Sequence, residues 1–173
     1  MVAEKLKTIL ITGCSAGGIG LAIAQVLAQR GHHVFATARD TSKIPTELSS
    51  LSNVTVLRVD VVSESSITES VQAVAAATEE LGSKGLDVLV NNAGIGYSMP
   101  LLDLDIERAQ ALYDTNVWGP VRMVQSFSQL LIAKRGRVVM ISSAGAFINT
   151  PWIGMPLGSW YFPLDLANMC DAT

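Results

Sequence analysis

A glycine-rich stretch near the start of the sequence has the residues of a phosphate-binding turn. Residues 12–20 read TGCSAGGIG and lie between the apolar run Ile9–Ile11 and a helix-like pattern over Leu21–Arg30. Glycine lets the backbone turn tightly and approach a ligand. The first amides of a helix lack internal partners and carry partial positive charge, so a pyrophosphate can bind there without a basic side chain. A plain glycine-rich surface turn is the alternative, because this pattern alone is weak evidence.

Polar residues stand at or just after the ends of three later apolar runs. They are Asp60, Asn91–Gly94 (NNAG) and the pair Ser142 and Ser143. Each can also be an ordinary turn residue, and Asp60 can cap a turn. The carboxyl ends of parallel strands meet at one edge of a sheet, where α/β folds bind their ligands. The spacing therefore predicts that these residues share one rim with the glycine-rich turn.

The elements that must position these residues alternate between strand-like and helix-like segments. The strand-like runs are continuously apolar, which is typical of strands covered by helices on both faces. The alternation predicts an α/β fold with a doubly wound, Rossmann-like parallel sheet of about five strands. The expected strands are Thr8–Thr12, His33–Ala38, Val54–Asp60, Leu86–Asn91 and Arg137–Ser142. The expected helices are Gly18–Arg30, Ile44–Ser50, Ser66–Leu81 and a long segment over about 105–134.

Two features set limits to these elements. Gly119 and Pro120 interrupt the long helical segment, so we expect two helices that meet near Thr115–Pro120. Residues 146–173 hold prolines and tryptophans at irregular spacing and show no clear period. We therefore expect a nucleotide-binding domain over residues 1–145 and an irregular C-terminal tail over residues 146–173.

The residues after the second expected strand bear on the choice of dinucleotide. The run His33–Ala38 is followed by Arg39 and Asp40. In NAD sites an acid near this point binds the ribose 2′-hydroxyl, whereas the planar fork of arginine suits a phosphate dianion. Because Arg39 directly follows the strand, we expect NADP (NADPH) as the cofactor. The alternative is that Arg39 is a solvated loop residue and Asp40 is the ribose acid.

Composition excludes several classes of protein. The 173 residues are 49% hydrophobic and 16% charged, with a formal net charge of -3, which argues against a disordered chain and against a nucleic acid partner. The two cysteines lie far apart without metal-ligand spacing, so we expect free thiols in a reducing compartment and no metal. The N-terminus is no signal peptide, and no apolar stretch reaches transmembrane length, so the expected location is cytoplasmic.

Taken in order, these motifs resemble the short-chain dehydrogenase/reductase family. The resemblance covers about residues 5–145 and is carried by Thr12–Gly20, Asp60, Asn91–Gly94, Asn116 and Ile141–Ser143. Several motifs in the right order are more specific than one glycine pattern. The glycine-rich turn is also similar to that of fungal NADPH-dependent 1-acyldihydroxyacetone-phosphate reductases. That likeness implies lipid metabolism and an association with the ER or lipid droplets.

The resemblance implies a reaction, namely hydride transfer between NADPH and a small-molecule carbonyl or secondary alcohol such as a lipid-like ketone. Ser143 would orient the reacting oxygen, and Asn116 would anchor a water in a proton relay. Arg39 would face the 2′-phosphate, Asp60 the adenine and Asn92 the cofactor ribose. The other implied cofactor-binding residues are Thr12, Gly13, Ser15, Gly17, Gly18, Ile19, Gly20, Ala93, Gly94 and Arg122.

The sequence departs from the family pattern in two places. The turn has one residue more between Gly13 and Gly20 than the family's usual Thr-Gly-x-x-x-Gly-x-Gly. The family's acid is a tyrosine followed four residues later by a lysine, but here Tyr161 is followed by Asp165, and no lysine occurs after Lys134. A neighbouring cation must lower the high pKa of a phenol for proton transfer near neutrality. We therefore expect the chain as written to be inactive.

The end of the sequence suggests an alternative to an active enzyme. Residues 156–173 read like unrelated sequence, as an unspliced intron or a frameshift would produce. The alternative is a truncated, non-catalytic nucleotide-binding protein or a gene-model product. A homo-oligomer is typical of the family, and we expect the truncation to impair it.

Overall fold

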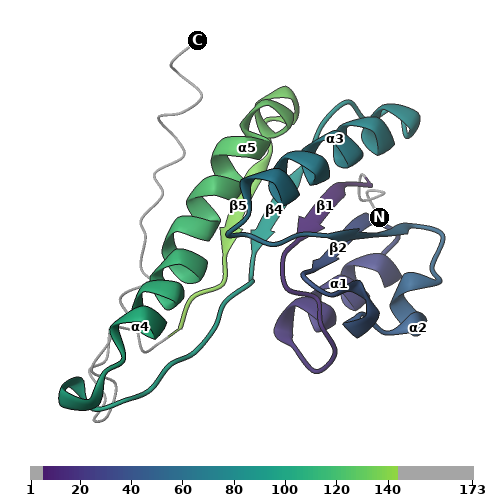
Figure 1. The fold of residues 1–173 in the computed structure, drawn as a ribbon. Coiled ribbons are helices and arrows are strands. Elements are labelled where there is room, and N and C mark those ends of the chain that lie inside the picture. The colour runs from purple at the N-terminus through teal and green to yellow at the C-terminus, as the bar shows by residue number, and fades with distance from the viewer. Residues whose placement is uncertain (1–5, 144–173) are drawn as a thin grey trace.

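A five-stranded parallel sheet forms the centre of the fold in the computed structural model, which describes residues 6–143 (Figure 1). The strand order is β3-β2-β1-β4-β5. The chain runs outward from β1 to β3 and then crosses to the other side of β1 for β4 and β5. This reversal at β1 confirms the predicted doubly wound, Rossmann-like fold. The strands are β1 (Thr8–Ile11), β2 (His33–Ala38), β3 (Val54–Arg58), β4 (Val88–Asn91) and β5 (Arg137–Met140).

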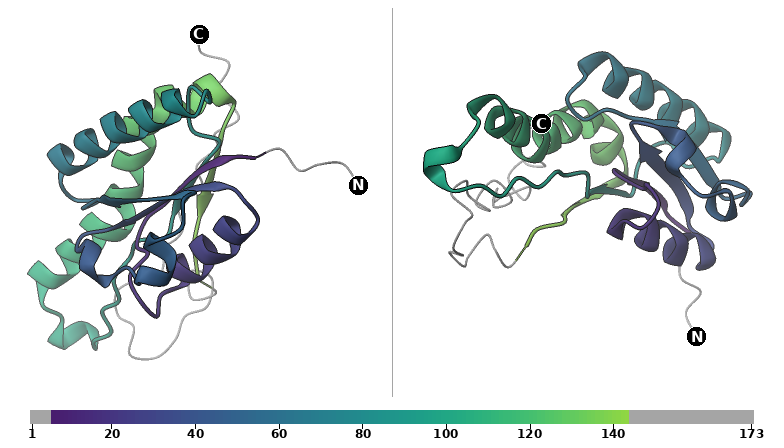
Figure 2. Two further views of the ribbon diagram at one scale, coloured as in Figure 1. Left: turned by 90° about the vertical axis from the view of Figure 1, so that its right-hand side faces the viewer. Right: turned by 60° about the horizontal axis from the view of Figure 1, so that its bottom comes forward.

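Helices cover both faces of this sheet, which is why its central strands are apolar along their whole length. Helices α1 (Ile19–Gln29) and α2 (Thr46–Ser49) lie on one face, and α3 (Glu64–Glu80) and α5 (Gly119–Lys134) on the other (Figures 1 and 2). Alternate residues of β1 therefore enter different cores: Ile9 and Ile11 pack with α1 and α2, and Leu10 packs with α3 and α5.

Local capping shifts some boundaries from those expected. Helix α3 begins at Glu64, ahead of the expected Ser66, because the Ser63 hydroxyl accepts a hydrogen bond from the Ser66 N–H at 3.3 Å. A serine in this position satisfies one of the orphan amides of the first turn. A 3₁₀ turn, η1 (Thr41–Lys43), links β2 to α2.

The long helical segment continues through one turn of π-helix. Helix α4 (Ile106–Tyr113) leads into a π-helical turn, η3 (Asp114–Trp118), and then into α5. Within η3 the Gly119 N–H donates to the carbonyl of Asp114, five residues back. Pro120 has no N–H to continue the α-helical pattern, and the wider turn lets the helix go on past it. The two helices expected to meet near Thr115–Pro120 are thus α4 and α5, and they are joined by this π-helical turn.

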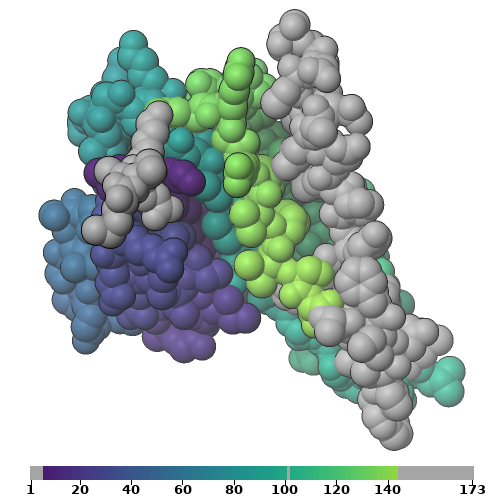
Figure 3. Space-filling view, turned by 180° about the vertical axis from the view of Figure 1, so that it is seen from behind, coloured from purple at the N-terminus to yellow at the C-terminus, as the bar shows by residue number. Residues whose placement is uncertain are grey.

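The far edge of the sheet is less covered than its centre. Val139 of β5 is 41% exposed, and Figure 3 shows the β5 segment at the surface beside α1. No helix within residues 6–143 is long and apolar enough to cross a bilayer. The expected tail over residues 146–173, including Tyr161 and Asp165, lies outside the described residues.

Truncating a core residue of α5 tests the packing of this face. Phe127 is fully buried, whereas Ile132 on the same helix is 39% exposed. We expect Phe127→Ala to lower the free energy of unfolding by about 3–5 kcal/mol through lost burial and a cavity. Ile132→Ala should cost about 1 kcal/mol or less. Urea denaturation measures both, and equal losses would contradict this packing.

Candidate functional site

One threonine side chain joins the ends of β1 and β4. The Thr12 hydroxyl accepts hydrogen bonds from the backbone N–H groups of Asn92 and Ala93, both at 2.9 Å. It donates to the Val90 carbonyl at 3.3 Å, and Thr12 is only 1% exposed. A hydroxyl has one proton and two lone pairs, so its bonding capacity is filled. Thr12 therefore holds the loop after β4 against the glycine-rich turn.

The glycine-rich turn packs on that loop so closely that position 20 has no room for a side chain. An added Cβ at Gly20 would lie 2.5 Å from both the Gly13 carbonyl oxygen and Asn92 Nδ2. That Nδ2 atom donates to the carbonyl of Thr12 at 2.8 Å and to that of Gly13 at 3.1 Å. Gly13 itself has a φ of 75°, a conformation that favours glycine. The two glycines are thus required for different reasons.

Two backbone hydrogen bonds join the turn to β2, the other neighbour of β1, and to the connection that follows β2. The Cys14 N–H donates to the Thr37 carbonyl, and the Ala16 N–H donates to the Lys43 carbonyl, both at 2.8 Å. The turn is therefore fixed on one side to β4 and on the other to the connection between β2 and α2.

Other amides of the turn are left available to a ligand. Within residues 6–143, the N–H groups of Ser15 and Ile19, which both line the cavity described below, have no hydrogen-bond acceptor. Gly18 is the N-cap of α1 and offers no side-chain oxygen to the first turn. Unpaired amides at a helix N-terminus attract anions. The close glycine packing and these amides together fit a phosphate group.

A cavity of about 370 Å³ lies over the carboxyl ends of β1 to β4. This position, beside the point where the strand order reverses, is where doubly wound folds bind nucleotides. Its size is within the usual range of small-molecule sites. The lining residues are Gly13, Ser15, Gly18, Ile19, Ala38, Arg39, Asp40, Lys43, Val59, Asp60, Val61, Asn92, Ala93, Gly94, Ile95 and Thr115.

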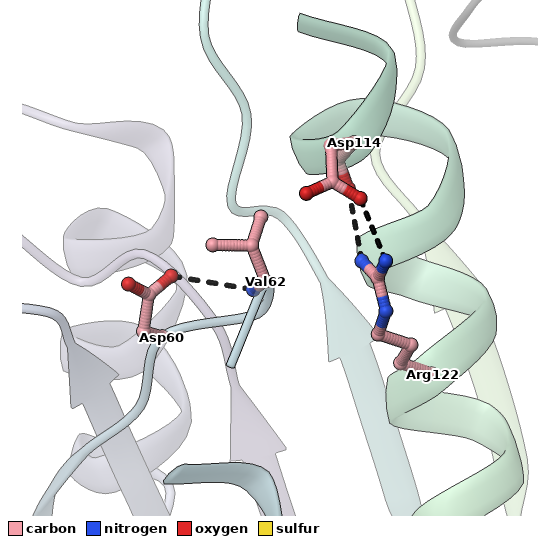
Figure 4. Close-up of polar contacts among 4 residues, drawn as sticks. All are labelled: Asp60, Val62, Asp114 and Arg122. Atoms are coloured by element: carbon pink, nitrogen blue, oxygen red, sulfur yellow. Dashed lines mark hydrogen bonds and ion pairs between the residues drawn. The ribbon is translucent and has the colours of Figure 1, made fainter. Parts of the chain in front are cut away.

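Most of the expected cofactor-binding residues line this cavity, but four of them do not. Thr12 and Gly20 lie in the packing between the turn and the loop after β4. Gly17 has a φ of 76° and serves the shape of the turn. Arg122 points toward Asp114, and its Nη2 lies 2.7 Å from the Asp114 carboxylate across the π-helical turn (Figure 4).

Six lining residues were not expected at the site from the sequence, namely Ala38, Lys43, Val59, Val61, Ile95 and Thr115. Ala38, Val59 and Val61 directly flank the expected residues Arg39 and Asp60. Ile95 and Thr115 are neighbours in sequence of Gly94 and Asn116, two residues of the family motifs. This proximity is the only feature of the sequence that could have predicted them. Lys43 stands four residues after Arg39, and its positive charge was the signal available there. Lys43 is held at the cavity because its carbonyl accepts a hydrogen bond from the Ala16 N–H. No sequence pattern predicts this bond.

Arg39 and Asp40, the two residues after β2, differ in their interactions. Asp40 Oδ1 accepts hydrogen bonds from the Ser42 hydroxyl at 2.6 Å and from the Ser42 N–H at 3.1 Å. These bonds, with a smaller effect of the Lys43 charge, hold the pKa of Asp40 below its usual value. Arg39 lines the cavity and forms no ion pair with any of residues 6–143. Asp40 is thus engaged in its own turn, while the Arg39 charge is available.

Asp60 caps a turn, as one of the two expected roles requires, and it also lines the cavity. Its Oδ1 accepts a hydrogen bond from the Val62 N–H at 3.3 Å (Figure 4), so it does cap a turn. Its own N–H donates to the Ser66 hydroxyl at 3.0 Å. It also lines the cavity. Only one of its carboxylate oxygens is used in the turn, so the other can accept from a ligand.

The two expected catalytic residues lie outside the cavity lining. Asn116, in η3, is 6% exposed and clasps the backbone of Ile95: its Oδ1 accepts from the Ile95 N–H at 2.9 Å, and its Nδ2 donates to the Ile95 carbonyl at 2.8 Å. This clasp fixes the loop after β4 to the helix. Ser143 is exposed and follows the last residue of β5 by three positions. Residues 6–143 contain no cluster of groups that could hold a metal ion.

The turn, the reversed strand order and the rim cavity together define a domain of the Rossmann type, a fold class that binds dinucleotides. A family model described as short chain dehydrogenase matches residues 7–156, so the chain belongs to this family of oxidoreductases, which use a nicotinamide cofactor. The chain is 47% identical over 149 residues to a short-chain dehydrogenase of Penicillium crustosum, covering 86% of this chain and 53% of that protein.

Other relatives and solved structures agree. The NADPH-dependent 1-acyldihydroxyacetone phosphate reductase of Schizosaccharomyces pombe is 39% identical over 145 residues, covering 84% of this chain and 47% of that protein. The chain thus spans about half the length of the curated relatives it matches. A short-chain dehydrogenase from Streptomyces avermitilis matches with a TM-score of 0.79 at 26% identity, covering 90% of this chain and 56% of that one. An alcohol dehydrogenase from Thermococcus sibiricus, complexed with 5-hydroxy-NADP, gives 0.76 at 29% identity, covering 90% and 66%.

Substituting Gly20 tests the close packing beneath the cavity. Helix propensity alone favours alanine over glycine at this helical position. We expect the opposite for Gly20→Ala, a loss of about 1–3 kcal/mol in the free energy of unfolding, because the added methyl meets Gly13 and Asn92. Gly96→Ala is the matched control, since nothing lies within 4 Å of its Cβ position. Stabilisation by Gly20→Ala in urea denaturation would show that the packing is looser than described.

The buried thiol of the turn gives a prediction about pH. Cys14 is 0% exposed, and burial raises the pKa of its thiol to about 11. In a Cys170→Ser background, the native protein should resist a thiol-specific disulfide reagent at pH 8. Between pH 9 and 11 only the unfolded thiol releases its proton, so the free energy of unfolding should fall by roughly 2–3 kcal/mol. A Cys14→Ala variant should lack this part of the decline; an identical decline would refute the assignment.

Proposed function

We propose that this chain carries the cofactor-binding half of an NADP-dependent oxidoreductase, with that domain over residues 1–145. The observation that carries the proposal is the single cavity that brings the free amides of the glycine-rich turn together with Arg39, Asp60 and Asn92. Amides suit the pyrophosphate, and a guanidinium suits a 2′-phosphate. When bound, the nicotinamide supplies or accepts a hydride.

The preference for NADP over NAD rests on the contrast between Arg39 and Asp40. A ribose acid must keep its carboxylate free for the 2′-hydroxyl. Asp40 Oδ1 already accepts two hydrogen bonds from Ser42. Arg39 has no ion-pair partner among the described residues, and its fork can bind a phosphate dianion. The alternative, in which Asp40 selects NAD, therefore has the weaker support.

In the proposed reaction Asn116 acts through its backbone carbonyl. Its side chain is committed to Ile95. A water of the proton relay would then donate a hydrogen bond to the Asn116 carbonyl oxygen. Ser143 orients the oxygen of a carbonyl or secondary alcohol. Arg122 contributes by holding the π-helical turn through Asp114.

The chain as written is proposed to hold the cofactor without turning it over. No lysine occurs after Lys134, so the sequence offers no Tyr-x-x-x-Lys pair to move a proton to the substrate. A non-catalytic nucleotide-binding protein is therefore the second candidate function. The substrate class of the lineage is a carbonyl or alcohol, with a lipid ketone favoured by the likeness to the Schizosaccharomyces pombe reductase. We place the protein in the cytoplasm, with contact to ER or lipid droplets and self-association as further proposals.

Fluorescence titration with NADPH and NADH tests this function. We expect NADPH to bind more tightly, and Arg39→Met to weaken NADPH binding roughly tenfold with little effect on NADH, because it removes a charge-assisted hydrogen bond. Arg30→Met, which changes the same charge at the end of α1 remote from the cavity, is the control. Incubation with a panel of carbonyl compounds should leave NADPH unconsumed. Steady NADPH consumption would refute the inactive assignment, and absence of binding would refute the site.

A further inference from the structure

A second cation faces the cavity that Arg39 lines. It belongs to Lys43, the last residue of η1. Arg39 directly follows β2, and the η1 turn brings Lys43 back to the same cavity four residues later. Neither of these side chains forms an ion pair with any of residues 6–143. Two basic groups from successive parts of one connection are therefore available to a single ligand.

The backbone of Lys43 is held in place although its side chain is exposed. Its carbonyl accepts the hydrogen bond from the Ala16 N–H at 2.8 Å, and its N–H donates to the Asp40 carbonyl at 3.2 Å. The next residue, Ile44, is 5% exposed and packs in the same core as Leu21 of α1. The origin of the Lys43 side chain is therefore fixed relative to the glycine-rich turn. Because the Lys43 backbone is already fixed, less conformational entropy is lost when the ammonium group binds a ligand.

The charges around the cavity give Lys43 a clear effect. The lining includes two acids, Asp40 and Asp60, and two bases, Arg39 and Lys43. Without Lys43 the lining would carry a net negative charge, with Asp40 directly beside Arg39 in the chain. Such a field repels a ligand that bears several phosphates. With Lys43, the two positive charges of the lining equal its two negative charges; Arg39 alone would leave one negative charge in excess.

We propose that Lys43 is a specificity-determining residue, which binds the 2′-phosphate of NADP together with Arg39. The inference rests on the proposed function, since it assigns a second cation to the phosphate that distinguishes NADP from NAD. Arg39 offers a planar fork from the end of β2, and Lys43 offers a compact point charge from η1. A dianionic phosphate has enough oxygens to accept from both groups.

Isothermal titration with NADP⁺ and NAD⁺ tests the role of Lys43, because the two molecules differ only by the 2′-phosphate. We expect Lys43→Met to weaken NADP⁺ binding roughly tenfold and to change NAD⁺ binding by less than about twofold. Lys43→Arg should keep most of the preference. Lys84→Met removes the same charge from an exposed loop before β4, at the opposite edge of the sheet, and should change neither affinity. Thermal melts by circular dichroism confirm that each variant is folded.

The outcomes separate this inference from the proposed function. A wild-type chain that prefers NADP⁺, with the same preference in Lys43→Met, overturns the role of Lys43 and leaves the proposed function standing. An equal loss of both affinities in Lys43→Met also overturns it, because the 2′-phosphate is then not the group bound. If Lys84→Met weakened NADP⁺ binding as much as Lys43→Met does, the cause would be the net charge of the protein, which would also overturn the role of Lys43. A wild-type chain without preference for NADP⁺ overturns the NADP proposal and this inference together.

Discussion

The contact between the ends of β1 and β4, made by Thr12, is the constraint on which the site depends. Its hydroxyl accepts two backbone N–H groups from the loop after β4, while Asn92 binds back to two carbonyls of the glycine-rich turn. Buried N–H groups without an acceptor would each cost about 1–3 kcal/mol. The strand order reverses between these two strands, so the contact sets the floor of the cavity and positions every residue above it.

A second hydrogen bond, on the other side of the turn, links the glycine-rich turn to the connection after β2. Because Ala16 donates to the Lys43 carbonyl, a shift of the turn would also move the connection that carries Arg39 and Asp40. The amides proposed to bind the pyrophosphate and the cations proposed to bind the 2′-phosphate are therefore held by one hydrogen-bonded arrangement. In the same way, the two hydrogen bonds between the Asn116 side chain and the Ile95 backbone fix the loop after β4 to the π-helical turn.

The sequence predicted the fold well because parallel strands buried on both faces have a strong apolar signal. The glycine motif indicated which edge of the sheet carries the site. It predicted the lining residues that sit directly at strand ends, such as Arg39, Asp60 and Asn92. It did not predict features that arise from contacts distant in sequence. The π-helical turn at Asp114–Trp118 depends on how Pro120 is accommodated, and Lys43 enters the cavity through a hydrogen bond to Ala16. Arg122 was expected near the cofactor, but its pairing with Asp114 depends on that π-helical turn.

Amide hydrogen exchange with and without saturating NADPH tests the central claim most directly, because it reads the site residue by residue without requiring turnover. If the cavity over β1 to β4 is the cofactor site, exchange should slow over residues 13–20, 39–43 and 92–95. The amides of Ser15 and Ile19 should show the largest change, since they gain an acceptor. Exchange in β5 should stay the same. Unchanged exchange over these three segments, or protection confined to other parts of the chain, would contradict the account.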